Sequence, residues 1–243
     1  SSDILISKNM QEVPLHSAHA VTVPGAISLF EEVADKFGNL GLKELCTQPI
    51  KYAEEGIVVS PRVSFDWFTH RKKLVGNSEN FYLNAGEPYK AGSLLKAPMQ
   101  AEVLRQIAAL GSKGFYQSDI TIDLVKSLKE LGGVHALADF ENVKVQYVDP
   151  IHVNLKDGST LIELPPNGQG ITAIMMKKLM EFCNIERFSA DSFERVHLEA
   201  EIAKIAYSAR NNFIGDPNIS AIKQNIFLEE TYLEKLSKEL SLG

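Results

Sequence analysis

The feature that most constrains the fold is an almost wholly apolar segment, Ile171 to Met180, which follows a β-hairpin signal. A helix without a polar face is buried on most sides, so other elements of the chain have to cover it. Ahead of it, the β-rich runs 151–155 and 160–164 flank Lys156-Asp157-Gly158-Ser159, and Asp-Gly between two such runs predicts a hairpin turn. We therefore predict an antiparallel hairpin, ended by Pro165-Pro166, and then a buried helix.

Most of the remaining chain has the 3.6-residue period of amphipathic helices. In the first such segment Ala26, Leu29, Phe30, Val33, Ala34 and Phe37 share one face, and Gly38 ends the helix. The same reasoning predicts helices over 42–55 with a break near Pro49, from Ser60-Pro61 onward, and over 98–110, 119–131, 191–210 and 229–240. Residues 76–92 are rich in turn formers and predict a surface excursion.

The period changes from 3.6 to 2 at Val143, because Val143, Val145 and Tyr147 alternate with polar residues. This predicts a further strand. The fold class is therefore a helix-dominant α+β protein with a small antiparallel β-hairpin region. With no internal repeat or low-complexity linker, we expect a single unit over residues 1–243, mostly helical over 25–140, with strands and buried helices over 142–243.

Composition excludes several classes of function. The 243 residues have a net charge of −6 and no basic run that could neutralise a row of phosphates, so we expect no nucleic-acid partner. No stretch reaches the roughly 18 consecutive apolar residues of a membrane span, so we expect no membrane partner and a soluble chain. Nothing in the sequence separates a cytoplasmic from a periplasmic location.

Two glycine-containing segments resemble phosphate loops only superficially. Gly168-Gln169-Gly170 lies at a strand-to-helix junction, where free backbone N–H groups attract anions, but it lacks the third glycine and the lysine of such loops. Gly111-Ser112-Lys113-Gly114 lacks the preceding strand and the required spacing. We interpret the first as a tight turn and the second as a helix stop followed by a turn.

Other candidate sites are also better explained as structure. His16 and His19 are three residues apart but have no carboxylate or cysteine cluster beside them, and a metal site needs three or four ligands. Cys46 and Cys183 suit small core residues better than a disulfide or a metal pair. The charges of 191–210, which include Asp191, Arg195, Glu199 and Arg210, fit a solvated helix face with i, i+4 pairs. We predict no catalytic, substrate-binding, cofactor or metal residue in this chain.

Several segments in collinear order resemble the γ-glutamyltransferase family. They are Val21-Thr22-Val23-Pro24-Gly25-Ala26, Phe37-Gly38 through Pro49-Ile50 with Ala53-Glu54-Glu55-Gly56, Leu110-Gly111-Ser112-Lys113-Gly114-Phe115-Tyr116, Glu163-Leu164-Pro165-Pro166-Asn167-Gly168-Gln169-Gly170, and Asn212-Phe213-Ile214-Gly215-Asp216-Pro217. The likeness runs from about residue 20 to the C-terminus and identifies the chain as the C-terminal part of a large subunit.

The resemblance implies an N-terminal-nucleophile hydrolase, whose precursor cuts itself to expose a threonine at the start of a small subunit. That threonine, activated by its own α-amino group, would attack the γ-glutamyl amide of glutathione or a related small substrate. It would lie downstream of Gly243, and the family's carboxylate-binding arginine would lie upstream of Val23-Pro24-Gly25. The chain would then be part of an αββα scaffold, inactive alone, with the small subunit and the N-terminal part of the precursor as its partners.

The chain departs from the family pattern in two places. Lys156-Asp157-Gly158 replaces a usual Tyr-Arg-containing turn, and the motif 165–170 also differs. Where typical transferases have Pro-Pro-Ser-Ser-Gly-Gly, this sequence has Pro165-Pro166-Asn167-Gly168-Gln169-Gly170, which is similar to branches that include acylases and small-amide hydrolases. Two alternatives therefore stay open. One is a related amidohydrolase or acylase acting on another amide, and the other is a non-catalytic helical binding module.

Overall fold

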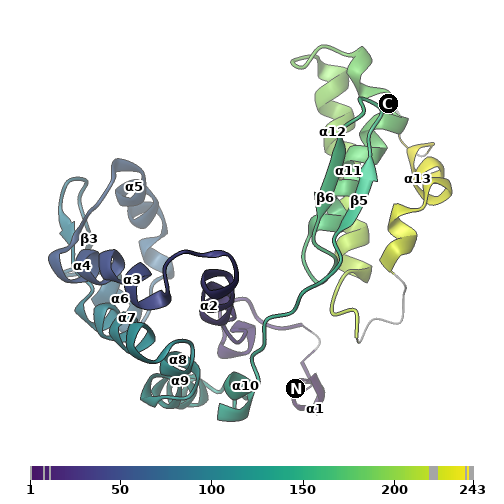
Figure 1. Ribbon diagram of the computed structural model, residues 1–243. Coiled ribbons are helices and arrows are strands. Elements are labelled where there is room, and N and C mark those ends of the chain that lie inside the picture. The colour runs from purple at the N-terminus through teal and green to yellow at the C-terminus, as the bar shows by residue number, and fades with distance from the viewer. Residues whose placement is uncertain (1, 8, 11, 219–223, 239, 241–243) are drawn as a thin grey trace. The chain divides into compact units, whose positions relative to one another are not determined.

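The computed structural model describes residues 2–7, 9–10, 12–218, 224–238 and 240 (Figure 1). Its internal contacts gather into two compact units, Ser1–Val145 and Gln146–Gly243. The boundary lies where the apolar period changes in the sequence. Each unit has its own buried cluster, and the expectation of a single unit over 1–243 stays a prediction.

The first unit is mostly helical, with two short antiparallel pairings of two-residue strands. Its elements are α1 (Ser2–Ser7), η1 (Ala18–Ala20), α2 (Ala26–Phe37), α3 (Leu42–Leu45), α4 (Thr47–Glu55), β1 (Ile57–Val58), α5 (Pro61–His70), η2 (Arg71–Lys73), α6 (Asn77–Tyr82), β2 (Leu83–Asn84), β3 (Glu87–Pro88), β4 (Leu94–Leu95), α7 (Pro98–Leu110), α8 (Lys113–Tyr116), α9 (Asp119–Glu130) and α10 (Leu137–Glu141). Strand β1 pairs with β4 and β2 with β3, both antiparallel.

Local capping confirms the predicted helix starts. The Ser60 hydroxyl accepts a hydrogen bond from the backbone N–H of Val63, and Pro61 occupies the first turn of α5. Ser118 caps α9 through the N–H of Ile120. The region 42–55 forms two short helices, as predicted, but they meet at Cys46, and Pro49 lies in the first turn of α4. The excursion at 76–92 contains α6 and the β2–β3 hairpin in addition to its turns.

The core of the first unit gathers around Tyr116, whose neighbours in the buried cluster include Val125, Leu128 and Phe140. Its hydroxyl donates to the carbonyl oxygen of Pro24 at 2.7 Å and accepts from the N–H of Ser28 at 3.3 Å. One side chain therefore joins the turn before α2 to α8, across about 90 residues of sequence.

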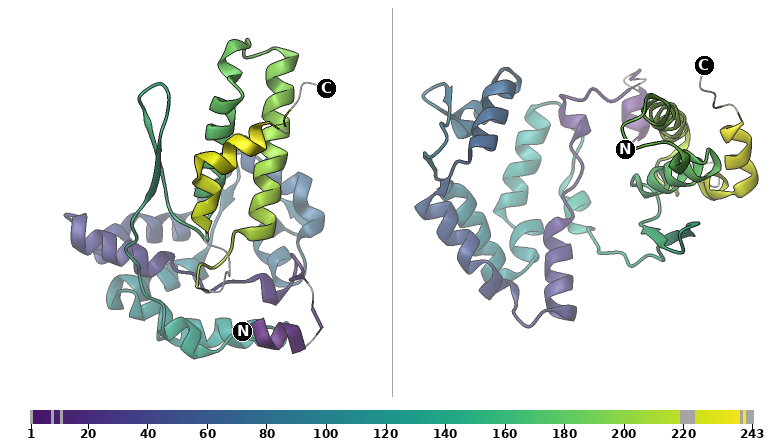
Figure 2. Two further views of the ribbon diagram at one scale, coloured as in Figure 1. Left: turned by 90° about the vertical axis from the view of Figure 1, so that its right-hand side faces the viewer. Right: turned by 90° about the horizontal axis from the view of Figure 1, so that it is seen from above.

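The second unit consists of a hairpin and helices. Its elements are β5 (Ile151–Asn154), β6 (Thr160–Glu163), α11 (Gly170–Phe182), η3 (Ile185–Arg187), α12 (Phe193–Phe213), η4 (Gln224–Leu228) and α13 (Glu230–Ser237). The hairpin is antiparallel with Asn154 opposite Thr160, and Gly158 in its turn has φ +86°, a conformation that favours glycine. Figures 1 and 2 show α11 and α12 side by side, and α13 packs against α11.

Helix α11 is the centre of the second unit, as its apolar sequence predicted. Ile171, Ile174, Met175 and Leu179 are each at most 2% exposed. Ile202 and Ala206 of α12 and Leu233 of α13 belong to the buried cluster around it. The hydrophobic stabilisation of this unit therefore depends on burying α11 on several sides.

The predicted strand over Val143, Val145 and Tyr147 is wrong. Residues 143–150 follow α10 without regular secondary structure, and no strand among the described residues pairs with them. Alternation fits any extended segment, and a strand also needs a hydrogen-bonded neighbour. Among the described residues, no helix has the length and apolar character of a membrane span.

Replacing Tyr116 by Phe should lower the free energy of unfolding of the first unit by about 1 kcal/mol, because the half-buried Pro24 carbonyl and Ser28 N–H lose their hydrogen bonds. Trp67 is the single tryptophan of the chain and lies in this unit, so its fluorescence during urea unfolding measures the effect. Tyr52→Phe is the matched control, because Tyr52 is 55% exposed. Equal effects of the two changes would contradict the role assigned to the Tyr116 hydroxyl.

Candidate functional site

The motif 165–170 forms the junction between β6 and α11. A Cβ atom at Gly170 would lie 2.7 Å from the Cβ of Glu163 and 2.7 Å from the carbonyl oxygen of Leu164. Glycine is therefore required there, because the start of the helix passes directly over the end of the strand. Gly168 has open space around it and a negative φ, so no such constraint acts on it.

Gln169 is the N-cap residue of α11, and both its backbone carbonyl and its side-chain oxygen accept hydrogen bonds. Its carbonyl oxygen accepts from the N–H groups of Thr172 and Ala173 at 3.0 and 3.3 Å. Its side-chain oxygen accepts from Arg210 Nη1 at 2.9 Å. Within the described residues the N–H groups of Gly170 and Ile171 have no backbone acceptor, as expected at a helix N-terminus.

Arg210 lies in the last turn of α12, and its guanidinium group is fixed by several contacts. Nε and Nη2 donate to Asn211 Oδ1 at 3.0 and 2.7 Å, and the group lies 4.7 Å from the ring centroid of Tyr207. The contact with Gln169 joins positions 41 residues apart. It joins the motif 165–170 to the last turn of α12, two residues before the motif 212–217 begins.

The contacts at this junction fix the strand end against the helix start, but they do not assemble a reaction centre among the described residues. A carboxylate or another anion is the chemistry that the end of α11 and the nearby guanidinium favour. Within the described part of the chain no nucleophile with an adjacent base lies at this junction, and no group of three or more His, Cys, Asp or Glu side chains could hold a metal ion. The prediction that this chain has no catalytic residue stays a prediction.

A buried ionic network holds the other end of α11. The Glu181 carboxylate accepts from Lys178 Nζ at 3.1 Å and from the backbone N–H of Lys156 at 2.6 Å. The ammonium of Lys156 donates to the Glu181 carbonyl oxygen at 2.8 Å. Glu230 of α13 lies 3.8 Å from Lys178. The hairpin turn, α11 and α13 are thus joined at one place.

Burial acts against ionisation of Glu181, but the hydrogen bond from Lys156 and the contact with Lys178 outweigh it and lower the pKa of Glu181 below its ordinary value of 4.5. Sequence reasoning missed this network. The only local signal was a Lys and a Glu three residues apart at the end of an apolar helix. The contact with Lys156 depends on how the hairpin folds against α11, so residue spacing along the sequence could not predict it.

The segment Gly111-Ser112-Lys113-Gly114 is a helix stop and a turn, as predicted. Helix α7 ends at Leu110, Gly111 has φ +67°, and α8 begins at Lys113. The N–H of Ser112 donates to Glu31 Oε1 at 3.0 Å. The backbone N–H at this turn therefore binds a carboxylate of the chain itself, that of Glu31 in α2.

The remaining candidates lie apart from the junction. Cys46 is buried in the first unit and Cys183 follows α11 in the second, and burial raises the pKa of both thiols. His19 belongs to η1, and its Nδ1 is buried without a hydrogen-bond partner among the described residues. On α12, Arg195 pairs with Glu199 at 3.0 Å, which is the predicted i, i+4 arrangement on a helix face.

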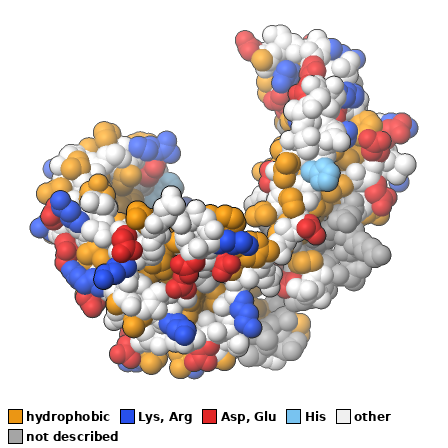
Figure 3. All heavy atoms as spheres, in the orientation of Figure 1, with side chains coloured by type: hydrophobic (Ala, Val, Ile, Leu, Met, Phe, Trp, Pro, Cys, Tyr) orange, Lys and Arg blue, Asp and Glu red, His pale blue; other side chains and the backbone are white. Residues whose placement is uncertain are grey.

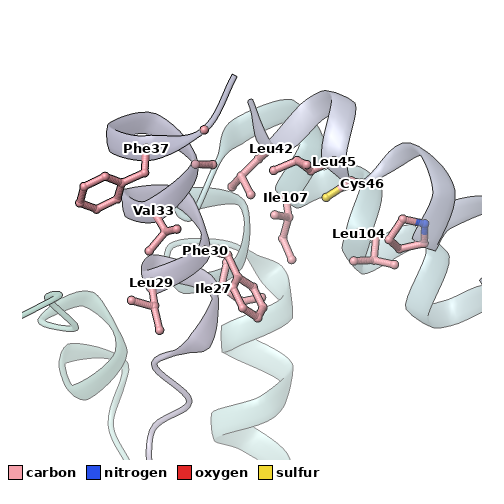
Figure 4. Close-up of a pocket in the computed structure, with 13 residues that line it drawn as sticks. Ile27, Leu29, Phe30, Val33, Phe37, Leu42, Leu45, Cys46, Leu104 and Ile107 are labelled. Carbon is pink, nitrogen blue, oxygen red and sulfur yellow. The ribbon is translucent and has the colours of Figure 1, made fainter. Parts of the chain in front are cut away.

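An apolar groove of about 620 Å³ lies in the first unit between α2 on one side and α3, α4 and α7 on the other (Figure 4). The stripe that predicted α2 to be amphipathic forms one wall, yet Phe30 and Phe37 are 57% and 68% exposed. Further lining residues are Ile27, Leu29, Val33, Ala34, Gly38, Leu42, Leu45, Cys46, Pro49, Leu104 and Ile107. An exposed apolar surface of this kind marks an interaction site.

Comparison with known proteins gives the same family throughout the chain. A family model described as gamma-glutamyltranspeptidase matches residues 2–242. A glutathione hydrolase proenzyme of Bacillus subtilis (strain 168) is 26% identical over 99% of this chain and 42% of its own length. An acylase proenzyme, ACY 1 of Pseudomonas sp. (strain V22), is 28% identical over 90% of this chain and 39% of its own.

The crystal structure of Helicobacter pylori γ-glutamyltranspeptidase superposes with a TM-score of 0.84 at 25% identity, and the match covers 96% of this chain and 69% of that one. The chain thus spans about two fifths of the length of the curated relatives it matches, and these are named proenzymes.

Glu181→Gln should lower the free energy of unfolding of the second unit by about 2 kcal/mol, because Lys178 then lacks its buried counter-ion. The helix signal of circular dichroism in urea measures this change, and Trp67 fluorescence reports the first unit as an internal control. Glu201→Gln removes an exposed pair of the same i, i+3 spacing with Lys204 and should have a much smaller effect. Equal losses would contradict the role of burial.

The same network predicts how stability depends on pH. Since folding lowers the pKa of Glu181, its contribution is complete above the ordinary value of 4.5 and is lost as the pH falls through the folded-state pKa. The difference in unfolding free energy between the native chain and Glu181→Gln should therefore shrink below pH 4.5. A difference that is constant across this range would refute the assignment.

Proposed function

The chain belongs to the γ-glutamyltranspeptidase family, and on that premise we propose that it is a scaffold part of an enzyme that hydrolyses or transfers the γ-glutamyl group of glutathione and related amides. The observation that carries the proposal is the family match over residues 2–242 in a chain that spans two fifths of proenzyme relatives. The collinear order of the motifs supports the same assignment.

In this proposal the chemistry takes place on a threonine outside the chain. The threonine hydroxyl adds to the γ-carbonyl carbon and its proton passes to the α-amino group of the same residue. The amine leaves with a proton, and water or a second amine then releases the γ-glutamyl group from the ester. The chain alone is inactive, since it supplies neither this nucleophile nor the family's carboxylate-binding arginine.

The role of the chain is to support an αββα layer arrangement. The hairpin β5–β6 adds to the edge of the central sheet, and α11 packs beneath that sheet. The fixed geometry at Gly170 and the Arg210–Gln169 contact support this role, because they hold the strand end and helix start in one arrangement. The groove beside α2 receives an apolar element from the small subunit or from the N-terminal part of the precursor.

A second candidate keeps the same nucleophile and changes the substrate. It is an amidohydrolase or acylase, and the 28% identity to the Pseudomonas acylase together with the sequence Asn167-Gly168-Gln169-Gly170 favours it. A third candidate, a helical binding module without catalysis, requires that the precursor never matures.

The full-length gene product tests these candidates. Mass spectrometry after incubation at neutral pH should find cleavage downstream of residue 243, and the cleaved sample should release aniline from a γ-glutamyl anilide. The glutaryl anilide is the matched substrate, because it differs only by lacking the α-amino group. Preference for the glutaryl compound would favour the acylase, and an intact, inactive product would favour the binding module. The chain of 243 residues should release no aniline.

Changing Phe30 and Phe37 to Ser should reduce binding of an apolar fluorescent dye by the isolated chain, because both side chains are exposed in the groove. In the full-length protein the same change should slow maturation, since the element that covers α2 loses its contacts. Met99→Ser is the control, because Met99 is 80% exposed outside the groove. Normal maturation of the Phe30→Ser, Phe37→Ser protein would rule out this docking role.

A further inference from the structure

A second surface of the first unit lies on α5 and has a composition different from that of the groove. The residues Pro61, Ser64, Phe65 and Phe68 recur at helical spacing and form one face of α5. This face and residues Glu87, Pro88, Lys90 and Ala91 enclose a cleft of about 590 Å³. Phe65 and Phe68 are 63% and 55% exposed, so two aromatic rings face solvent in a preformed cleft.

Contacts of Ser64 and Trp67 fix the wall of this cleft. Trp67 packs edge-on against Tyr82 and Tyr89, with ring centroids 5.5 and 6.0 Å apart. The Ser64 hydroxyl donates to the carbonyl oxygen of Tyr89 at 2.9 Å. The β2–β3 hairpin is therefore held against α5, and the cleft does not depend on a ligand for its shape.

Basic side chains border the aromatic rings. The guanidinium of Arg71 lies 4.1 Å from the centroid of the Phe68 ring, and Lys90 lines the cleft. Neither of them, nor Lys72 or Lys73, pairs with a carboxylate among the described residues, whereas Asp66 already binds Arg62. In Figure 3, Lys and Arg side chains lie beside apolar side chains over α5.

The charge of this segment is opposite to that of the chain. Residues 60–96 contain six Lys and Arg against three Asp and Glu, while the whole chain contains 25 against 31. A local positive field next to exposed aromatic rings attracts an anionic partner that also carries apolar groups.

We propose that the cleft between α5 and the β2–β3 hairpin binds an acidic peptide segment, with Phe65 and Phe68 contacting its apolar or proline side chains and Arg71, Lys72, Lys73 and Lys90 pairing with its carboxylates. Single-stranded nucleic acid fits less well. The Phe68 ring face that a base would stack on is covered by Arg71.

Fluorescence anisotropy of a fluorescein-labelled peptide in which Glu alternates with Pro and Phe tests the proposal on the 243-residue chain. Saturable binding is expected, and it should weaken about tenfold in Lys72→Glu, Lys73→Glu and in Phe65→Ser, and for a peptide with Gln in place of Glu. The matched control is Lys126→Glu, Lys129→Glu on α9, which should change affinity less than about twofold. Circular dichroism and Trp67 emission verify that each variant is folded.

Three outcomes would overturn the proposal. They are no saturation up to about 1 mM peptide, an equal loss in the α9 control, and tighter binding of an oligothymidylate than of the peptide. The last result would assign the cleft to nucleic acid instead.

Discussion

Burial of α11 is the constraint on which the second unit depends. A helix with apolar side chains around most of its circumference is stable only when several neighbours cover it, and here the hairpin, α12 and α13 do so. Its two ends are then fixed in different ways, by close approach at the start and by polar contacts at the end. Gly170 lets the start of the helix lie against β6, and the carboxylate of Glu181 joins its end to the hairpin turn. Packing provides most of the free energy, and the polar contacts determine which arrangement of the hairpin is adopted.

The first unit buries the apolar surface of its helices only in part. Tyr116 and its neighbours form a small buried cluster, while the apolar stripe of α2 stays largely exposed. Helical periodicity correctly identified this stripe, because periodicity depends only on which residues share a face. It could not tell whether the covering partner is in the same chain. The curated relatives are more than twice as long as this chain.

The sequence correctly predicted those parts of the fold that a few neighbouring residues determine. Ser60-Pro61, the Asp157-Gly158 turn and the stop at Gly111 depend on a few adjacent residues and are confirmed. The error at Val143 to Tyr147 arose because alternation contains no information about a pairing partner. The contact of Arg210 with Gln169 could not be predicted from spacing either. Their side chains meet only because α11 and α12 pack side by side, and the family motifs include Gln169 but not Arg210.

The hydrogen bond between Ser112 and Glu31 joins residues 81 positions apart, and it has a consequence for synthesis of the chain. At about 5–20 residues per second, a ribosome needs roughly 4–16 s to make the residues that separate α2 from this partner. During that time α2 has emerged with Phe30 and Phe37 exposed and without its long-range contacts. A newly made chain at this stage exposes the apolar surface that chaperones recognise. The dependence of its yield on chaperones should therefore be set by α2 and not by α11, which is made later and is covered by elements of its own unit.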